Sequence, residues 1–179
     1  MALPTVTPSR ADVARLVSRA RAGDRSAYAE LYGRMRGAVN AVILARVPRS
    51  DVGDVMQDTF VAAWTQLSEL REDAAFPGWV LEIARRRSVD CGRRGRVRAH
   101  DELSDEGTAT VDAPTLEAKR ALEAIEALPM AYRETLLMRL VEGMNGPEIA
   151  EATGLTPESV RVNLCRGMKL LKERLGGES

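Results

Sequence analysis

The chain has 179 residues, and its 26 basic and 26 acidic side chains give a formal net charge of +0 at neutral pH. This length accommodates one large or two small domains with a buried core, and the balanced charge indicates no class of partner. No apolar run reaches the length of a signal peptide or a membrane span, so neither export nor membrane insertion is expected. Cys91 and Cys165 lack the spacing of a zinc site or a disulfide framework, which fits the reducing cytoplasm.

Charge is distributed unevenly along the chain. Residues 1–98 carry 17 Lys and Arg against 11 Asp and Glu, whereas residues 99–126 carry 2 against 8. Residues 127–179 are balanced, with 7 of each sign. This pattern indicates a basic module and a neutral module joined by an acidic connector.

The first half of the chain predicts a series of helices, because apolar residues recur with helical spacing and no strand-like alternation of any length appears. A short apolar stripe around Leu16 marks the first helix. The second begins after Asp24, a good N-cap, and ends before Pro48, whose ring cannot continue the hydrogen-bond ladder. The third is predicted to start at Ser50.

Acidic residues gather on one face of the third helix, at Asp51, Asp54, Asp58 and the neighbouring Gln57. Like charges at these spacings repel by a few tenths of a kcal/mol, about 0.2–0.5 kcal/mol per pair, so the face is expected to meet a basic partner. A solvated acidic face is the alternative, and one helix face offers too few converging ligands for a metal. The buried side of this helix is predicted to include Phe60, Val61 and Trp64.

The fourth helix is predicted to run from about Trp79 into an arginine-rich segment. Residues 84–98 hold seven arginines and one aspartate. On a helix they form a positive surface able to neutralise several phosphates, although a solvated helix end or a localisation-type patch is also consistent with the composition. Phe76 and Trp79 precede the run, and interleaved aromatic and arginine side chains suit single-stranded nucleic acid. For Trp79, core packing is the expected role.

The segment from Gly95 to Pro114 is polar, acidic and poor in large apolar residues, and predicts a flexible linker between two domains. The only histidine, His100, lies there without partners for a general base or a metal ligand. No nucleophile–base pair, phosphate loop or metal cluster occurs elsewhere. We therefore expect a protein that is not an enzyme and holds no cofactor or metal.

A helix-turn-helix pattern follows in "EIAEATGLTPESVRVNL", residues 148–164. Ile149 is an apolar anchor, and Gly154 occupies the tight turn, where a left-handed backbone is needed. Leu155 is expected to point to the core. Thr156 is a good N-cap and Pro157 suits the first helical position. The free face of the second helix carries Glu158, Ser159, Arg161, Val162, Asn163 and Arg166, which suits a recognition helix for base edges and phosphates. An ordinary helical hairpin is the alternative.

Together these segments resemble the extracytoplasmic-function (ECF) sigma factors of bacterial RNA polymerase. "AYAELYGRMRGAVNAVILARV", "DVMQDTFVAAW" and "FPGWVLEIARRRSVDCGRR" resemble sigma region 2. "LPMAYRETLLMRLVEGMNGPEIAEATGLTPESVRVNLCRGMKLLKERL" resembles sigma region 4. The resemblance implies an all-α fold with region 2 over residues 8–95, a flexible acidic linker over 96–113, and the region 4 helix-turn-helix over 114–176.

The resemblance also implies partners and site residues. Region 2 is expected to dock on the β′ clamp helices of core RNA polymerase through Asp54, Gln57 and Asp58, and region 4 to meet the β flap. The loop from Ser68 to Gly78 matches the segment that captures a flipped base of the −10 promoter element. The −10 DNA is expected to contact Arg85, Arg86, Arg87, Arg93 and Arg94. The −35 element is expected to contact Thr156, Pro157, Glu158, Ser159, Arg161, Val162, Asn163 and Arg166.

A cytoplasmic bacterial sigma factor with an anti-sigma factor as a further partner is therefore the function expected from the sequence. Val162 and Asn163 replace the small polar and basic residues common in the family, and they are suited to a thymine methyl and an adenine, respectively. Two other functions are alternatives. A stand-alone helix-turn-helix regulator never binds polymerase, and a sigma mimic binds only an anti-sigma factor.

Overall fold

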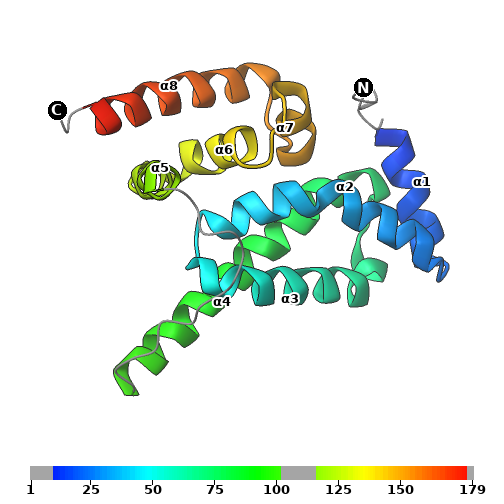
Figure 1. Cartoon of the computed structure of the whole chain (residues 1–179). Coiled ribbons are helices and arrows are strands. Elements are labelled where there is room, and N and C mark those ends of the chain that lie inside the picture. Colours follow the sequence, from blue (N-terminus) through cyan, green and yellow to red (C-terminus); the bar gives the residue numbers. More distant parts are fainter. Residues whose placement is uncertain (1–9, 102–115, 177–179) are drawn as a thin grey trace.

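The computed structural model describes residues 10–101 and 116–176, and all regular structure in these two ranges is helical (Figure 1). The first domain contains α1 (Arg10–Arg21), α2 (Arg25–Leu44), α3 (Val52–Thr65) and α4 (Phe76–Asp101), with 3₁₀ turns at Arg49–Asp51, Leu67–Glu69 and Asp73–Ala75. The second contains α5 (Leu116–Glu126), α6 (Met130–Leu140), α7 (Gly146–Thr153) and α8 (Pro157–Gly176). The predicted all-α fold is confirmed. Residues 8, 9 and 102–115, and the side chain of His100, lie outside the description.

Local capping explains where several helices begin. The Asp24 carboxylate accepts from the backbone N–H groups of Ser26 at 2.9 Å and Ala27 at 3.1 Å, as an N-cap does. The Ser26 hydroxyl, which donates to the same carboxylate at 2.6 Å, holds the pKa of Asp24 well below its usual range, with further contributions from the Ala27 N–H and Arg19. The start predicted for the third helix is displaced. Ser50 lies in a 3₁₀ turn and its hydroxyl donates to the Asp51 carboxylate at 3.0 Å rather than capping a backbone N–H, so α3 begins at Val52.

The core of the first domain lies where α2 packs against α1, α3 and α4. Its largest fully buried side chains include Phe76 and Leu81. The prediction for the buried side of α3 was partly wrong. Phe60 is buried, but Val61 is 56% exposed and Trp64 36% exposed. The buried stripe of α3 runs through Val55, Thr59, Phe60, Ala62 and Ala63, and the 100° step per residue turns Val61 away from it.

The second domain buries one face of α8 against α6 and α7. Val160 and Leu171 are buried there. A Cβ at Gly167 would lie 3.0 Å from Leu136 Cδ1, so glycine at this position lets α8 approach α6 closely. Leu155 does not point to the core as predicted, because it lies in the turn before α8 and is 38% exposed.

The two domains contact each other through a polar seam. Figure 1 shows α6 and α7 lying along α2, and both α2 and α4 contribute to the contact. The Glu134 carboxylate lies between Arg46, in the turn after α2, and Arg85 of α4, with 3.0 Å to Arg85 Nη2. Asn40 donates to the Glu142 carboxylate at 2.6 Å, while a guanidinium N–H of Arg133 donates to the Ala45 carbonyl at 2.8 Å.

Candidate nucleic-acid interface

The helix-turn-helix is held by short-range contacts. A capping box opens α7: Asn145 accepts from the Glu148 backbone N–H at 2.9 Å, and the Glu148 carboxylate accepts from the Asn145 backbone N–H at 2.7 Å. Gly154 ends α7 in the left-handed conformation, with φ of +74°. Thr156 then accepts from the Ser159 backbone N–H at 3.1 Å, as predicted for the N-cap of α8. The caps at Asn145 and Thr156 and the left-handed Gly154 therefore define the turn between α7 and α8 through local contacts.

One face of α8 presents the predicted −35 residues to solvent. Thr156, Pro157, Glu158, Arg161 and Arg166 are exposed. Ser159, Val162 and Asn163 are half-buried. The ion pair between Arg161 and Glu158 spans 3.6 Å with both side chains largely exposed, so it holds Arg161 only weakly. Cys165, which the prediction did not include, is exposed and lies one helical turn beyond Arg161 on the same stripe.

The five predicted −10 arginines do not share one surface, because consecutive helical residues diverge by 100°. Arg85 faces α6 and binds the Glu134 carboxylate with two N–H groups, at 3.3 and 3.0 Å. Burial lowers the pKa of Arg85, but the Glu134 and Glu82 carboxylates outweigh it and the net shift is upward. Arg86 and Arg93 are exposed. Arg87 and Arg94 line a depression shared with α3.

That depression, of about 400 Å³, combines the acidic face of α3 with α4. Its lining includes the predicted polymerase-binding residues Asp54, Gln57 and Asp58, all of which are exposed. The Cys91 thiol donates to the Asp51 carboxylate at 3.5 Å. Burial raises the pKa of Cys91, and this hydrogen bond raises it further, so the thiol stays protonated at neutral pH. The carboxylates and two arginines therefore meet at one site.

An apolar groove lies beside this acidic face, between α2 and α3. It is lined by Tyr28, Tyr32, Gly53, Met56, Gln57, Phe60, Val61 and Trp64. The rings of Tyr28 and Trp64 meet edge to face, with centroids 4.7 Å apart. The Tyr28 hydroxyl donates to the Phe60 carbonyl, and burial raises the pKa of Tyr28. Gln57 thus lies at the boundary between an acidic and an aromatic surface, which the sequence did not indicate.

The loop predicted to capture a base connects α3 to α4. Leu67 and Leu70 anchor its first part in the core, and Phe76 and Pro77 anchor its end. Between the anchors, the exposed residues are Ser68, Glu69, Arg71, Glu72 and Ala75. Trp79, half-buried on the first turn of α4, packs at a ring-centroid distance of 6.0 Å from Phe76, in agreement with its expected core role.

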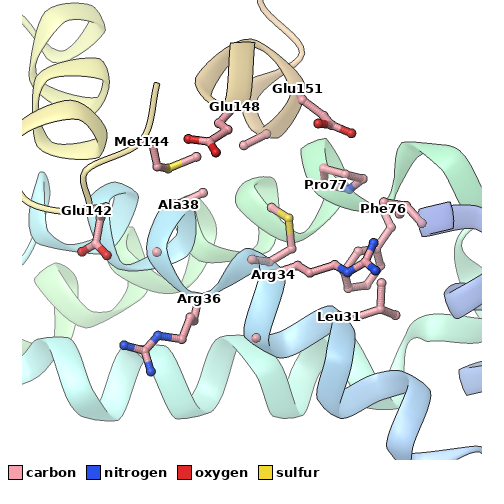
Figure 2. Close-up of a pocket in the computed structure, with 15 residues that line it drawn as sticks. Leu31, Arg34, Arg36, Ala38, Phe76, Pro77, Glu142, Met144, Glu148 and Glu151 are labelled. Carbon is pink, nitrogen blue, oxygen red and sulfur yellow. The ribbon is translucent and has the colours of Figure 1, made fainter. Parts of the chain in front are cut away.

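A cavity of about 360 Å³ lies between the domains (Figure 2). Leu31, Met35 and Phe76 contribute apolar wall, and Figure 2 shows Glu148 and Glu151 entering from α7. Burial raises the pKa of Glu151; Arg10 and Arg34 oppose this effect. Of the predicted site residues, Phe76 and Pro77, at the end of the loop predicted to capture a base, line this cavity.

Comparisons with known proteins match both domains. The model of Sigma-70 region 2 matches residues 31–99, and that of Sigma-70, region 4 matches residues 118–171. The chain is 32% identical over 163 residues to the RNA polymerase sigma factor NccH of Alcaligenes xylosoxydans xylosoxydans, covering 84% of this chain and 88% of that protein. It is 31% identical over 186 residues to the ECF RNA polymerase sigma factor SigD of Mycobacterium bovis, covering 96% and 88%.

The chain belongs to the ECF group of the sigma-70 family.

A solved structure, that of CnrH in complex with the cytosolic domain of CnrY, is similar to this sigma factor. The TM-score is 0.63 at 28% identity, with 93% of this chain and 99% of CnrH covered. Region 2 includes α3 and most of α2 and α4, and region 4 includes α6, α7 and most of α5 and α8. The protein is accordingly an alternative sigma factor that binds core RNA polymerase and directs promoter-specific initiation. Within residues 10–101 and 116–176, the helices are all too short or too polar to cross a membrane.

Proposed function

We propose that region 2 of this sigma factor docks on the β′ clamp helices through one continuous face of α3. The face combines exposed Asp54, Gln57 and Asp58, named the acidic set for its two carboxylates, with the aromatic groove that contains Val61 and Trp64. Carboxylates provide steering and orientation toward a basic partner, and the exposed apolar side chains provide area that loses water on docking. Region 4 is proposed to meet the β flap.

The −10 element is proposed to contact α4 and the preceding loop. Arg86 and Arg93 are exposed and can meet phosphates directly. Arg87 and Arg94 lie beside the carboxylates of α3, so DNA competes with those carboxylates for them. Arg85 is held by Glu134 of region 4 and reaches DNA only when that ion pair separates. The loop supplies exposed polar groups for an unstacked base.

The −35 element is proposed to lie against α8. Arg161 and Arg166 are exposed and suited to base edges or phosphates, while the half-buried Val162 and Asn163 are suited to a thymine methyl and an adenine. Thr156, Pro157, Glu158 and Ser159 lie at the amino end of α8, where backbone N–H groups favour a phosphate.

The remaining assignments follow from the family. An anti-sigma factor is proposed as a further partner, because the similar CnrH was solved in complex with the cytosolic domain of CnrY. The site of action is proposed to be the bacterial cytoplasm, where polymerase and promoters are found, and the protein is proposed to be no enzyme, as its relatives are initiation factors. Domain limits of 8–95 and 114–176 are proposed, with 96–113 as the connection. The first residues of this connection differ from the predicted flexible linker, because α4 continues as a helix to Asp101.

The observation that carries this proposal is the juxtaposition of the exposed acidic set and the aromatic groove on α3, within the region 2 match. Its test is co-elution with purified bacterial core polymerase on size exclusion. Asp54→Ala combined with Gln57→Ala is expected to weaken binding at least tenfold, whereas Glu123→Ala combined with Glu126→Ala, on exposed positions of α5, leaves it unchanged. Equal binding by both double variants would place the polymerase contact elsewhere.

A further inference from the structure

Arg21, at the carboxyl end of α1, is joined to the loop between α3 and α4 by several polar contacts. Its guanidinium donates to the Leu70 carbonyl at 2.8 Å and to the Leu67 carbonyl at 3.4 Å. It also forms an ion pair with the Asp73 carboxylate at 2.8 Å. In Figure 1 this loop lies beside α1, in agreement with the contacts between α1 and both 3₁₀ turns of the loop.

These contacts join the two ends of the loop. Leu67 opens the 3₁₀ turn that follows α3, and its carbonyl accepts from the Leu70 backbone N–H at 3.4 Å while keeping a second lone pair for Arg21. A charged donor such as a guanidinium forms stronger hydrogen bonds to these carbonyls than a neutral donor would. Asp73 opens the 3₁₀ turn that leads into α4. One guanidinium therefore binds the exit from one helix and the entry to the next.

The loop that Arg21 holds at both ends also carries exposed side chains. Leu67 and Leu70 are buried, while Ser68, Glu69, Arg71 and Glu72 between the two attachment points are exposed. The Arg21 side chain is itself only 35% exposed and the Asp73 side chain 24%, so water screens their pairing less than at a fully open surface. A loop held at both ends presents its exposed side chains in one arrangement, which is a requirement for selecting one base over others.

We propose that Arg21 is a positioning residue for −10 recognition, which fixes the loop so that its exposed side chains meet the unstacked base in a single geometry. The inference rests on the proposed role of this loop in base capture. Arg21 contacts no DNA in this scheme and acts through the loop backbone and Asp73. Its removal changes the base preference at the captured position more than it changes general affinity for DNA.

The first arm of the test follows the loop in the free, full-length chain. Arg21→Ala is expected to speed amide hydrogen exchange in residues 68–75 about tenfold, since hydrogen bonds from a charged donor are lost. Arg19→Ala is the matched control, because Arg19 lies on the same helix but pairs with Asp24. Asp73→Asn removes only the ion pair. It provides a second, milder variant in case Arg21→Ala does not fold. Its exchange is expected to lie between wild type and Arg21→Ala.

The second arm measures base selection. Holoenzyme assembled with bacterial core polymerase is presented with single-stranded DNA of random sequence, and bound strands are sequenced. The expected result for Arg21→Ala is loss of preference at one position, with the preferences at other positions kept, while Arg19→Ala selects the wild-type motif. An unchanged motif or unchanged exchange in Arg21→Ala would overturn the inference. If wild-type holoenzyme selects no motif, the proposed role of the loop fails, and the inference fails with it.

Discussion

The guanidinium of Arg85 in region 2 lies 3.0 Å from the carboxylate of Glu134 in region 4, and Arg46, in the turn after α2, binds the same carboxylate. The Glu134 and Arg46 side chains are only 13% and 15% exposed, so this three-residue cluster lies inside the seam between the domains. An arginine proposed to bind −10 DNA is thus occupied by the domain proposed to bind −35 DNA. The two functions depend on the same domain arrangement.

Replacing Glu134 with glutamine is expected to open the seam. Two partly buried guanidinium groups would then face each other without a carboxylate, at a cost of about 1.5–3 kcal/mol for the lost charged hydrogen bonds. Small-angle X-ray scattering of the free chain should show a larger radius of gyration. Glu126→Gln, on an exposed position of α5, serves as the control. Identical scattering from wild type and Glu134→Gln would show that the cluster does not hold the domains together.

Replacing Gly154 with alanine is expected to destabilise region 4 by about 1 kcal/mol, because a Cβ is disfavoured at the observed φ of +74°. Gly154→Asn should recover most of the loss, since asparagine tolerates the left-handed conformation. Thermal unfolding followed by circular dichroism checks both variants. Equal melting temperatures for the alanine variant and wild type would contradict the turn geometry.

The Asp24 cap predicts a pH dependence of stability. Its pKa is lowered in the folded state, so its stabilising contribution is fully present above the unfolded pKa of about 4 and is lost as the pH falls through the folded pKa. Asp24→Asn keeps a capping oxygen without the charge. The difference in melting temperature between wild type and this variant should be constant from pH 7 to pH 5 and shrink below pH 4. A difference that grows on acidification would rule out the ionised cap.

Much of the fold could be predicted from the sequence because the relevant forces are local. Gly154, Thr156 and Pro157 specify the turn and the start of α8 within a few residues, and Asp24 does so for α2. Contacts between distant segments could not be predicted in this way. Nothing near Glu134 or Arg21 in the chain indicates that each binds groups on helices or loops far away in sequence. Pairings of this kind depend on how the domains and the loop pack after the helices form.

The predicted −10 set illustrates the same limit. The arginine run indicated a positive surface, but consecutive arginines on α4 face α6, solvent and α3 in turn. Composition gives the charge of a helix, whereas the neighbours of each side chain depend on its angular position.

Val61 provides a test of the aromatic groove. Val61 is 56% exposed, so Val61→Lys should cost little stability. The new charge would lie against the clamp helices and weaken core polymerase binding by about tenfold, which corresponds to about 1.4 kcal/mol of binding free energy. Val141→Lys, at a 47% exposed valine of region 4, is the matched control. Binding titrations with fluorescently labelled chain give both values. The groove would be excluded as a docking surface if the two variants bound equally well.

Arg166 is expected to contribute to DNA affinity rather than to base choice. Its replacement by alanine should weaken duplex binding by a similar factor across −35 sequences and reduce the salt slope of log K by about 1. Arg174, exposed near the end of α8, is the control position. Fluorescence anisotropy at several salt concentrations measures the slope. A change confined to one −35 sequence would instead assign Arg166 to a base contact.

Promoter-specific initiation by this chain is tested most directly by in vitro transcription from a library of random promoter sequences, with bacterial core polymerase alone and with the chain added. The result expected of a sigma factor is a set of discrete transcripts that appear only when the chain is present and share two sequence elements upstream of their start sites. These transcripts should disappear with Asp54→Ala combined with Gln57→Ala, and their persistence in that variant would contradict the proposed docking face. The absence of transcripts, together with tight binding of the chain alone to duplex DNA, would contradict promoter-specific initiation by this chain and indicate a regulator that acts without polymerase.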